Sequence, residues 1–243
     1  MDPIEQFNTE KKERIESYPN DKLFQSVSKE WLKESFKKQY EYNFTWLGRP
    51  IIQYPSDIMA MQEIIWQVKP DLIIETGIAH GGSIIFSASM LEIIGHGEVL
   101  AIDIDIRKHN RIEIENHSMF KRITMIEGSS IDDNVIAEVE KRSKNKNRIL
   151  VFLDSNHSHK HVLSELNLYS KFVSKDSYII VFDTFVEDLP DNFVIDRPWN
   201  KGNNPKTAVW EFMKNNDDFI IDKVIENKLV ITSAYDGFLK KIN

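Results

Sequence analysis

Asp71-Leu-Ile-Ile-Glu-Thr-Gly-Ile-Ala-His-Gly-Gly-Ser83 is the stretch of sequence that decides the fold. Its apolar half predicts a short strand, and its glycines predict a turn into an apolar helix over 84–94. Glycine lets the backbone approach a ligand closely, and the free N–H groups at a helix start favour an electronegative group. The pattern indicates a cofactor-binding turn. Its spacing, Gly77, Gly81 and Gly82, differs from the G-x-G-x-x-G of nicotinamide enzymes, and an ordinary strand-to-helix loop is the alternative.

A second predicted strand, Gly97-Glu-Val-Leu-Ala-Ile-Asp103, ends in an acid that follows the turn by 103 − 82 = 21 residues. In units of this kind, a carboxylate about 20 residues after the glycine turn binds the ribose of the cofactor. Asp103 is therefore the predicted ribose-binding residue.

Three more apolar segments, 122–128, 148–154 and 178–183, predict the rest of a parallel sheet. Four of the five predicted strands end in an acid: Glu75, Asp103, Asp154 and Asp183. The carboxyl ends of the strands in an open parallel sheet face the ligand crevice, so we expect these carboxylates to gather around one site. A single strand-end acid is more often a helix cap or turn residue, but four in series favour a site.

Composition limits the class of protein. With 243 residues, 41% hydrophobic and 28% charged, the chain has material for one α/β domain plus a small extension. No apolar stretch approaches the ~20 residues that span a bilayer, and the N-terminus lacks the features of a signal peptide. The absence of cysteine excludes disulfides and thiolate chemistry, and a net charge of −7 argues against nucleic acid. We expect a cytoplasmic enzyme with a small-molecule substrate.

The two ends of the chain differ from the central α/β pattern. Residues 1–45 predict a helical extension, with a domain over 46–243, and apolar residues in the extension follow helical spacing: Leu23, Val27, Trp31 and Phe36. We assign no chemistry to this extension, which would cover the domain or join a second identical subunit. At the other end, two alternating segments, 219–225 and 228–233, predict an antiparallel hairpin. Five parallel strands and this hairpin make a mostly parallel sheet of seven strands.

A long loop over 185–205 follows the fifth strand directly. Trp199 offers an apolar face on which a substrate ring can pack, and Asn200–Pro205 supplies flexible joints for a lid. Acids along the loop are further candidates for hydrogen bonding to substrate, although solvated loop acids are the safer default: Asp188, Asp191 and Asp196.

From about Trp46 onward, the sequence resembles the S-adenosylmethionine-dependent methyltransferases of the cephalosporin-hydroxylase and rhamnosyl O-methyltransferase family, which have a Rossmann-like class I fold. The resemblance rests on the following segments: Pro70–Ser83, Ala101-Ile-Asp103, Glu127-Gly-Ser-Ser130, Leu153-Asp-Ser-Asn-His157 with His161, and Gly202-Asn-Asn-Pro-Lys-Thr207.

The resemblance implies roles for individual residues. Those along the methionine part of S-adenosylmethionine would be Glu75, Gly77, Ala79 and Ser83. Asp103 would hold the ribose and Ser129 would lie near the adenine, with Asp154 shared between the cofactor and a divalent metal, normally Mg²⁺. Many relatives carry Glu-Asp-Thr after the fifth strand, whereas this chain has Phe182-Asp183-Thr184, so one carboxylate is missing. Asp154, Asp183, the Thr184 hydroxyl, waters and substrate oxygens would complete the metal's coordination. Strand-end caps without metal are the alternative.

Methyl transfer to oxygen needs positioning and deprotonation of the acceptor. His157 lies just after Asp154, where an imidazole can take the proton or contact the substrate; a helix-start histidine bonded to the loop is the equal alternative. The leading hypothesis is a metal-assisted O-methyltransferase acting on a sugar hydroxyl, nucleotide-linked or in a surface polysaccharide. The alternatives are an antibiotic-pathway methyltransferase or hydroxylase component on a non-sugar acceptor, and a non-catalytic cofactor-binding subunit.

Overall fold

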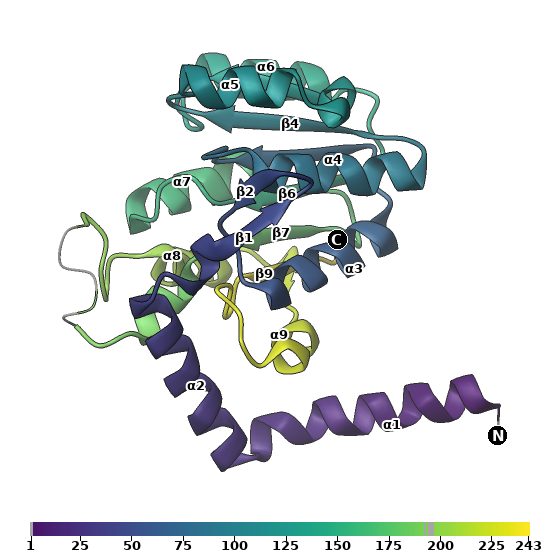
Figure 1. Cartoon of the computed structure of the whole chain (residues 1–243), viewed down its shortest axis with the longest axis vertical. Helices are drawn as coiled ribbons and strands as arrows, with labels where there is room; N and C mark the ends of the chain where they lie inside the picture. The colour runs from purple at the N-terminus through teal and green to yellow at the C-terminus, as the bar shows by residue number, and fades with distance from the viewer. Residues whose placement is uncertain (1, 192, 194–196) are drawn as a thin grey trace.

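A computed structural model describes residues 2–191, 193 and 197–243. Its centre is a seven-stranded sheet in the order β5-β4-β3-β6-β7-β9-β8 (Figure 1). The strands are β3 (Leu72–Thr76), β4 (Glu98–Asp103), β5 (Ile123–Glu127), β6 (Ile149–Leu153), β7 (Tyr178–Val181), β8 (Phe219–Ile221) and β9 (Phe238–Lys241). The first five pair in parallel, whereas β9 is antiparallel to both β7 and β8. The predicted α/β class and the mostly parallel seven-stranded sheet are confirmed.

Helices cover both faces of this sheet. The helices that connect or flank the strands are α3 (Pro55–Val68), α4 (Gly82–Ile94), α5 (Lys108–Glu115), α6 (Asp133–Ser143), α7 (His159–Tyr169), α8 (Pro205–Lys214) and α9 (Lys223–Leu229). Alternate residues of β3 enter opposite cores: Ile73 packs with α3 and α4, and Leu72 and Ile74 pack with α6, α7 and α8. Burial on both faces explains why the central strands are almost wholly apolar.

The chain reverses direction across the sheet between β3 and β6. From β3 it proceeds outward through β4 to β5, and it then returns to place β6 on the other side of β3. The ends of β3 and β6 are joined at this point, since the Asp154 amide donates to the Thr76 carbonyl at 2.9 Å. Such a switch point leaves a crevice at the carboxyl ends of the strands, which is where ligands bind in open α/β sheets.

The predicted C-terminal hairpin is correct as an antiparallel pair but wrong in its segments. Residues 223–229 form helix α9, and the second strand begins only at Phe238. Asp222 caps the helix by accepting from the Val224 amide, and Ile225 and Leu229, four residues apart, pack onto the core. A spacing of four is helical, so the short alternating pattern indicated the wrong period.

The N-terminal extension is helical, as predicted, but only the C-terminal half of the predicted apolar stripe packs onto the domain. Its elements are α1 (Pro3–Ser17), η1 (Tyr18–Asn20), α2 (Lys22–Lys37) and η2 (Tyr40–Asn43), followed by a two-stranded ribbon of β1 (Phe44–Trp46) and β2 (Arg49–Ile51). Leu23 and Val27 are exposed, whereas Phe36 packs against Phe185 and half-exposed Trp31 lies against Tyr54. The fully buried residues of α2 are Ser28, Leu32 and Ser35. Helix α1 runs outside the body of the molecule (Figure 1). Association into identical subunits stays a prediction.

Within the described ranges, no helix combines the length and apolar character that crossing a membrane requires.

Candidate functional site

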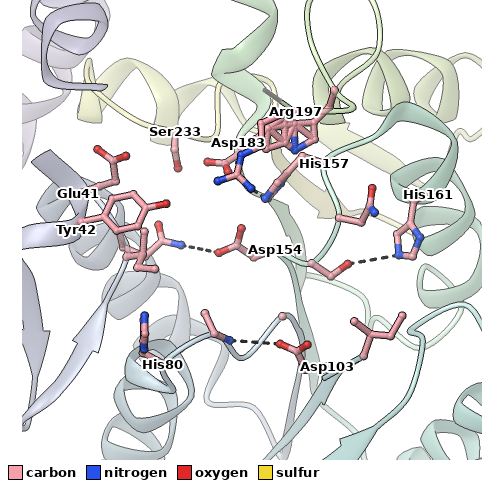
Figure 2. A pocket seen from close by; sticks show the side chains of 18 of the residues that line it. Glu41, Tyr42, His80, Asp103, Asp154, His157, His161, Asp183, Arg197 and Ser233 are labelled. Carbon is pink, nitrogen blue, oxygen red and sulfur yellow. Dashed lines mark hydrogen bonds and ion pairs between the residues drawn. The ribbon is translucent and has the colours of Figure 1, made fainter. Parts of the chain in front are cut away.

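A cavity of about 1030 Å³ lies at the carboxyl ends of the strands. Its walls include three of the four predicted strand-end acids, Asp103, Asp154 and Asp183, which reach it from β4, β6 and β7 (Figure 2). The sheet order β4-β3-β6-β7 places these three strand ends close together. The expectation that the strand-end acids gather around one site is correct for these three.

Glu75, the fourth acid, lies beneath the glycine turn rather than in the cavity wall. It is almost completely buried, and its carboxylate accepts hydrogen bonds from the hydroxyls of Ser83 and Ser87. Burial raises the pKa of Glu75 to about 7, against the lowering effect of the two serines. Ser83 borders a small recess of about 40 Å³ beside the cavity, together with Gln53, Gly77 and Asp154. Glu75 therefore supports the turn from below.

Gly77 and Asp103 fix the shape of the glycine turn. Gly77 has φ +94°, and a Cβ atom there would lie 2.1 Å from the Asp154 carbonyl oxygen, so no other residue fits. The Asp103 carboxylate accepts from the amides of Ile78 at 2.7 Å and Ala79 at 3.3 Å. Its second oxygen accepts from the Asp105 amide at 3.1 Å. Since a carboxylate offers about four lone-pair sites, Asp103 retains acceptor capacity toward the cavity.

The other end of the cavity holds a cluster of ionisable groups. Asp154, His157 and Asp183 each offer one ligand atom, and these atoms all lie within 4.8 Å of one another. His157 Nε2 lies 3.4 Å from Asp183 Oδ2. Asp183 has φ 56°, a left-handed conformation that aspartate tolerates better than most residues. The cluster therefore unites three of the four polar residues that the sequence predicted at the ends of β6 and β7, Thr184 being the exception.

The electrostatic environment of Asp154 is unusual. Burial raises its pKa well above the ordinary value, and the charge of Asp183 raises it further, with smaller contributions from Glu75 and Glu165. A hydrogen bond from Gln53 Nε2 to Asp154 Oδ2, at 3.0 Å, acts in the opposite direction. Two neighbouring carboxylates repel each other when both are ionised, and a cation bound between them would relieve this repulsion.

Phe182 and Thr184, on either side of Asp183, are turned away from the cluster. Phe182 is buried in the apolar core, and the Thr184 hydroxyl donates to the Ser233 carbonyl at 3.2 Å. Neither residue is among the described side chains that line the cavity. A metal-ligand role for Thr184 thus stays a prediction that competes with this bond.

Ser129 lines the cavity next to a set of hydrogen-bonded polar side chains from α7 and from the loops before it. His161 Nε2 lies 3.0 Å from Ser130 Oγ and 3.6 Å from Glu165 Oε1. The Ser155 hydroxyl donates to Glu165 at 2.7 Å. This network fixes the wall where the sequence resemblance predicts adenine. His159 has a different role, since its Nδ1 lies 2.8 Å from Thr207 Oγ1 on α8.

The loop after β7 brings Trp199 to the cavity. Its ring packs edge-on against His157, with the ring centroids 5.1 Å apart, and the Arg197 guanidinium lies 5.3 Å from the indole centroid. The loop acids are paired with lysines: Asp188 with Lys206 at 2.6 Å and Asp191 with Lys201 at 3.3 Å. Asp196 lies outside the described residues.

The predicted joints over Asn200–Pro205 are tied by hydrogen bonds rather than free. The amides of Asn200 and Asn203 bond to each other's carbonyls at 3.1 and 3.0 Å. Asn204 caps α8 (Pro205–Lys214) and also donates to Glu187. These bonds would have to break or shift if the loop moves as a lid, and the predicted lid motion stays a prediction.

Several cavity residues were missed by the sequence analysis. Figure 2 shows Glu41 and Tyr42 on one wall and Ser233 near Asp183, and Gln53 contacts Asp154. For Gln53 the signal was a single polar residue in the apolar run Ile51–Tyr54. For Ser233 there was no local signal, because its position depends on fully buried Asp57 of α3, which accepts from the Ser233 amide at 2.8 Å.

Comparison with known proteins identifies the family. The family model "Rhamnosyl O-methyltransferase/CmcI" matches residues 38–242. The chain belongs to this family. A rhamnosyl O-methyltransferase of Mycobacterium leprae is 32% identical over 215 residues, covering 85% of this chain and 89% of the relative. The protein of the same name from Mycobacterium tuberculosis strain H37Rv is 31% identical over 217 residues, covering 85% and 83%. The protein is therefore an O-methyltransferase.

Solved structures support the fold of this family member. The structure described as "cmcI-D160 Mg-SAM" matches with a TM-score of 0.58 at 17% identity, covering 83% of this chain and 78% of its own. An O-methyltransferase from Bacillus cereus, in complex with SAH, matches with a TM-score of 0.53 at 16% identity, covering 93% and 97%. The fold is that of Rossmann-like S-adenosylmethionine-dependent methyltransferases, as the sequence predicted.

Proposed function

We propose that this family member transfers the methyl group of S-adenosylmethionine to a sugar hydroxyl, with the assistance of a divalent cation. The observation that carries the proposal is that one cavity holds both the Asp103-bound glycine turn and the Asp154–His157–Asp183 cluster. A methyl donor at the first feature and an acceptor at the second would share a single water-restricted space, and proximity of this kind supplies much of the rate of a group transfer.

At the cofactor end, Asp103 has remaining acceptor capacity for the ribose hydroxyls, and the wall containing Ser129 and Ser130 is polar enough to contact the adenine. Gly77 and Ala79 line the space between ribose and cluster, where the methionine part belongs. Glu75 and Ser83 would act from beneath, by holding the turn. S-adenosylmethionine, when bound, supplies an electrophilic methyl group.

The cluster fits a divalent cation by its donor chemistry. Two carboxylates and an imidazole suit Mn²⁺ and other transition metals, and the two carboxylates with water suit Mg²⁺, which accepts few protein ligands. A cation would also relieve the mutual repulsion of Asp154 and Asp183, which the raised pKa of Asp154 reflects. When bound, a divalent cation supplies Lewis acidity that makes a neighbouring hydroxyl easier to deprotonate.

The chain's own residues then have distinct tasks. We assign to His157 the acceptance of the proton of the reacting hydroxyl, and its Nε2 lies 3.4 Å from Asp183 Oδ2. Gln53 holds the Asp154 carboxylate in one orientation. Trp199 packs against His157 and offers the remaining ring surface to a sugar. If His157 instead belongs to a cation's ligand set, proton acceptance must fall to another base, and the pH dependence of the rate would distinguish the two.

The sugar itself is supported by the relatives, which are named for a rhamnosyl acceptor. The cavity volume of about 1030 Å³ accommodates a cofactor and one or two sugar rings. We therefore propose a deoxyhexose-containing acceptor, nucleotide-linked or part of a polysaccharide.

A methyl-transfer screen tests this proposal. The purified protein is incubated with S-adenosylmethionine and MgCl₂ against methyl α-L-rhamnoside, nucleotide-linked rhamnose and a phenolic control, and products are detected by a one-methyl increase in mass. We expect methylated sugar, loss of activity with a chelator and recovery with Mg²⁺ or Mn²⁺. Methylation of the phenol alone would contradict the sugar assignment, and full activity in the chelator would contradict the role of the cation.

A further inference from the structure

Glu41 is a buried acid in the part of the chain to which the sequence analysis assigned no chemistry. It lies in η2, directly after Gln39 and Tyr40, where Gln39 adopts a left-handed φ of 53° and redirects the chain after α2. The side chain is only 8% exposed. A carboxylate is rarely buried to this degree unless it is paired.

One oxygen of this carboxylate lacks a hydrogen-bond partner in the part of the chain that the structure describes. Glu41 Oε2 is completely shielded, and no donor among the described residues bonds to it. Most buried polar atoms in proteins are hydrogen-bonded, so an unpaired oxygen on a residue that lines a cavity indicates a carboxylate that can turn toward a donor of a ligand. Glu41 lines the cavity, and Figure 2 shows it beside Tyr42 on the wall opposite Asp154, His157 and Asp183.

The chemistry of this wall favours a neutral hydroxyl as the missing partner. Burial raises the pKa of Glu41 and the nearby charge of Asp183 adds to the effect, whereas hydrogen bonding from its own backbone amide and from the Tyr54 hydroxyl lowers it. A hydroxyl can donate to an ionised carboxylate and can also accept from a protonated one, whereas an ammonium group requires the ionised form. A sugar ring carries several hydroxyls, so one can occupy the catalytic cluster while a neighbour contacts the opposite wall.

We propose that Glu41 binds a second hydroxyl of the acceptor sugar and thereby selects which hydroxyl reaches the Asp154–His157–Asp183 cluster. The inference rests on the proposed function, because it takes the acceptor to be a sugar. It assigns substrate specificity to the N-terminal extension, which thus takes part in recognition as well as covering the domain.

Binding measurements with deoxy sugars test this role. Calorimetry is performed on the full-length protein saturated with S-adenosylhomocysteine and MgCl₂, with methyl α-L-rhamnoside and its three monodeoxy analogues as probes. The variants are Glu41→Gln, Glu41→Asp and the matched control Glu30→Gln, an exposed acid of α2 outside the cavity. We expect Glu41→Gln to weaken rhamnoside binding roughly tenfold or more, with unchanged affinity for S-adenosylhomocysteine and no effect of Glu30→Gln.

The decisive result is non-additivity. For one deoxy analogue, the affinity for wild type should be as low as the affinity of the parent sugar for Glu41→Gln. The affinity of Glu41→Gln for this same analogue should be little lower than its affinity for the parent sugar. Glu41→Asp, which keeps the charge but withdraws the oxygen, should show the same pattern if Glu41→Gln does not fold. The assignment would be overturned if Glu41→Gln lost affinity equally for all four sugars, or if wild type did not bind the rhamnoside. Binding that depends on Glu41 without methyl transfer would refute the proposed function and leave the Glu41 contact standing.

Discussion

The two ends of the cavity are built in different ways. The end that we propose binds the cofactor, called the cofactor end, is centred on the stretch from Glu75 to Asp103, with Ser129 in the adjoining wall. It consists mainly of backbone: a glycine turn whose amides are held by one carboxylate. The end that we propose binds the acceptor, called the acceptor end, is assembled from segments far apart in the sequence, around residues 41, 53, 154–157, 183, 199 and 233. A contiguous backbone motif can be detected from spacing alone, whereas a site made of side chains from several elements depends on the whole fold.

The ends also differ in charge. The cofactor end keeps one carboxylate occupied by three amides. The acceptor end brings two partly buried carboxylates close together with a single imidazole in the cluster. We therefore expect substitutions at the acceptor end to act on the rate and those at the cofactor end to act on affinity and stability.

The largest effect should follow from Asp154→Asn. Removing this charge takes away a cation ligand and should lower kcat by about 10³-fold, because Lewis-acid assistance supplies several kcal/mol of transition-state stabilisation. Steady-state kinetics and Mn²⁺ binding by electron paramagnetic resonance check both parts. The affinity of Asp154→Asn for S-adenosylhomocysteine should fall far less than its kcat. If this variant keeps full kcat, the acceptor end does not control the rate as we expect.

Gly77→Ala tests the cofactor end of the cavity. The new methyl group would collide with the Asp154 carbonyl, at 2.1 Å, in a backbone with φ +94°, so the turn must move. Cofactor affinity should fall about 100-fold, as expected when several hydrogen bonds are misplaced.

Gly95→Ala is the matched control, since Gly95 has φ +93° but no described heavy atom within 4 Å of the added carbon. It should cost only about 1–2 kcal/mol of unfolding free energy and leave cofactor affinity unchanged. If both variants behave alike in calorimetry and chemical denaturation, close packing at Gly77 is not what shapes the cofactor end.

Glu75→Gln probes the support beneath the turn through pH. The pKa of Glu75 is raised to about 7 from an ordinary value of 4.5, so between these values the unfolded chain loses a proton that the folded chain keeps. The contribution of Glu75 to stability must therefore fall as pH rises from 4.5 to 7, by up to about 3 kcal/mol, whereas glutamine contributes no such dependence. Urea denaturation at both pH values measures the difference between wild type and variant. A difference that is constant with pH would contradict burial of a neutral Glu75.

The smallest effect is expected for Trp199→Ala. Loss of its ring surface should raise KM for the sugar about three- to tenfold and leave cofactor affinity unchanged. The control is Trp66→Ala, because Trp66 is half exposed on α3 and lies outside the cavity lining. Unaltered kinetics in Trp199→Ala would place the acceptor elsewhere in the cavity.

Sequence reasoning predicted the residues whose position follows from the parallel sheet. Asp103, Asp154 and Asp183 are at strand ends, so strand period and sheet order were enough to bring them together. Glu41 and Ser233 could not be predicted, because their positions depend on a left-handed turn at Gln39 and on a buried bond to Asp57. The C-terminal hairpin failed for a local reason: helical and strand periods are nearly indistinguishable over a segment as short as Val224–Leu229.

The most direct test of the account is a crystal structure with S-adenosylhomocysteine and Mn²⁺, the metal being located by its anomalous scattering. The account predicts one Mn²⁺ peak in contact with the carboxylates of Asp154 and Asp183, and the cofactor ribose against Asp103, with both in the same cavity. A metal peak elsewhere, or a ribose bound away from Asp103, would contradict the claim that the two ends of this cavity hold the methyl donor and its acceptor.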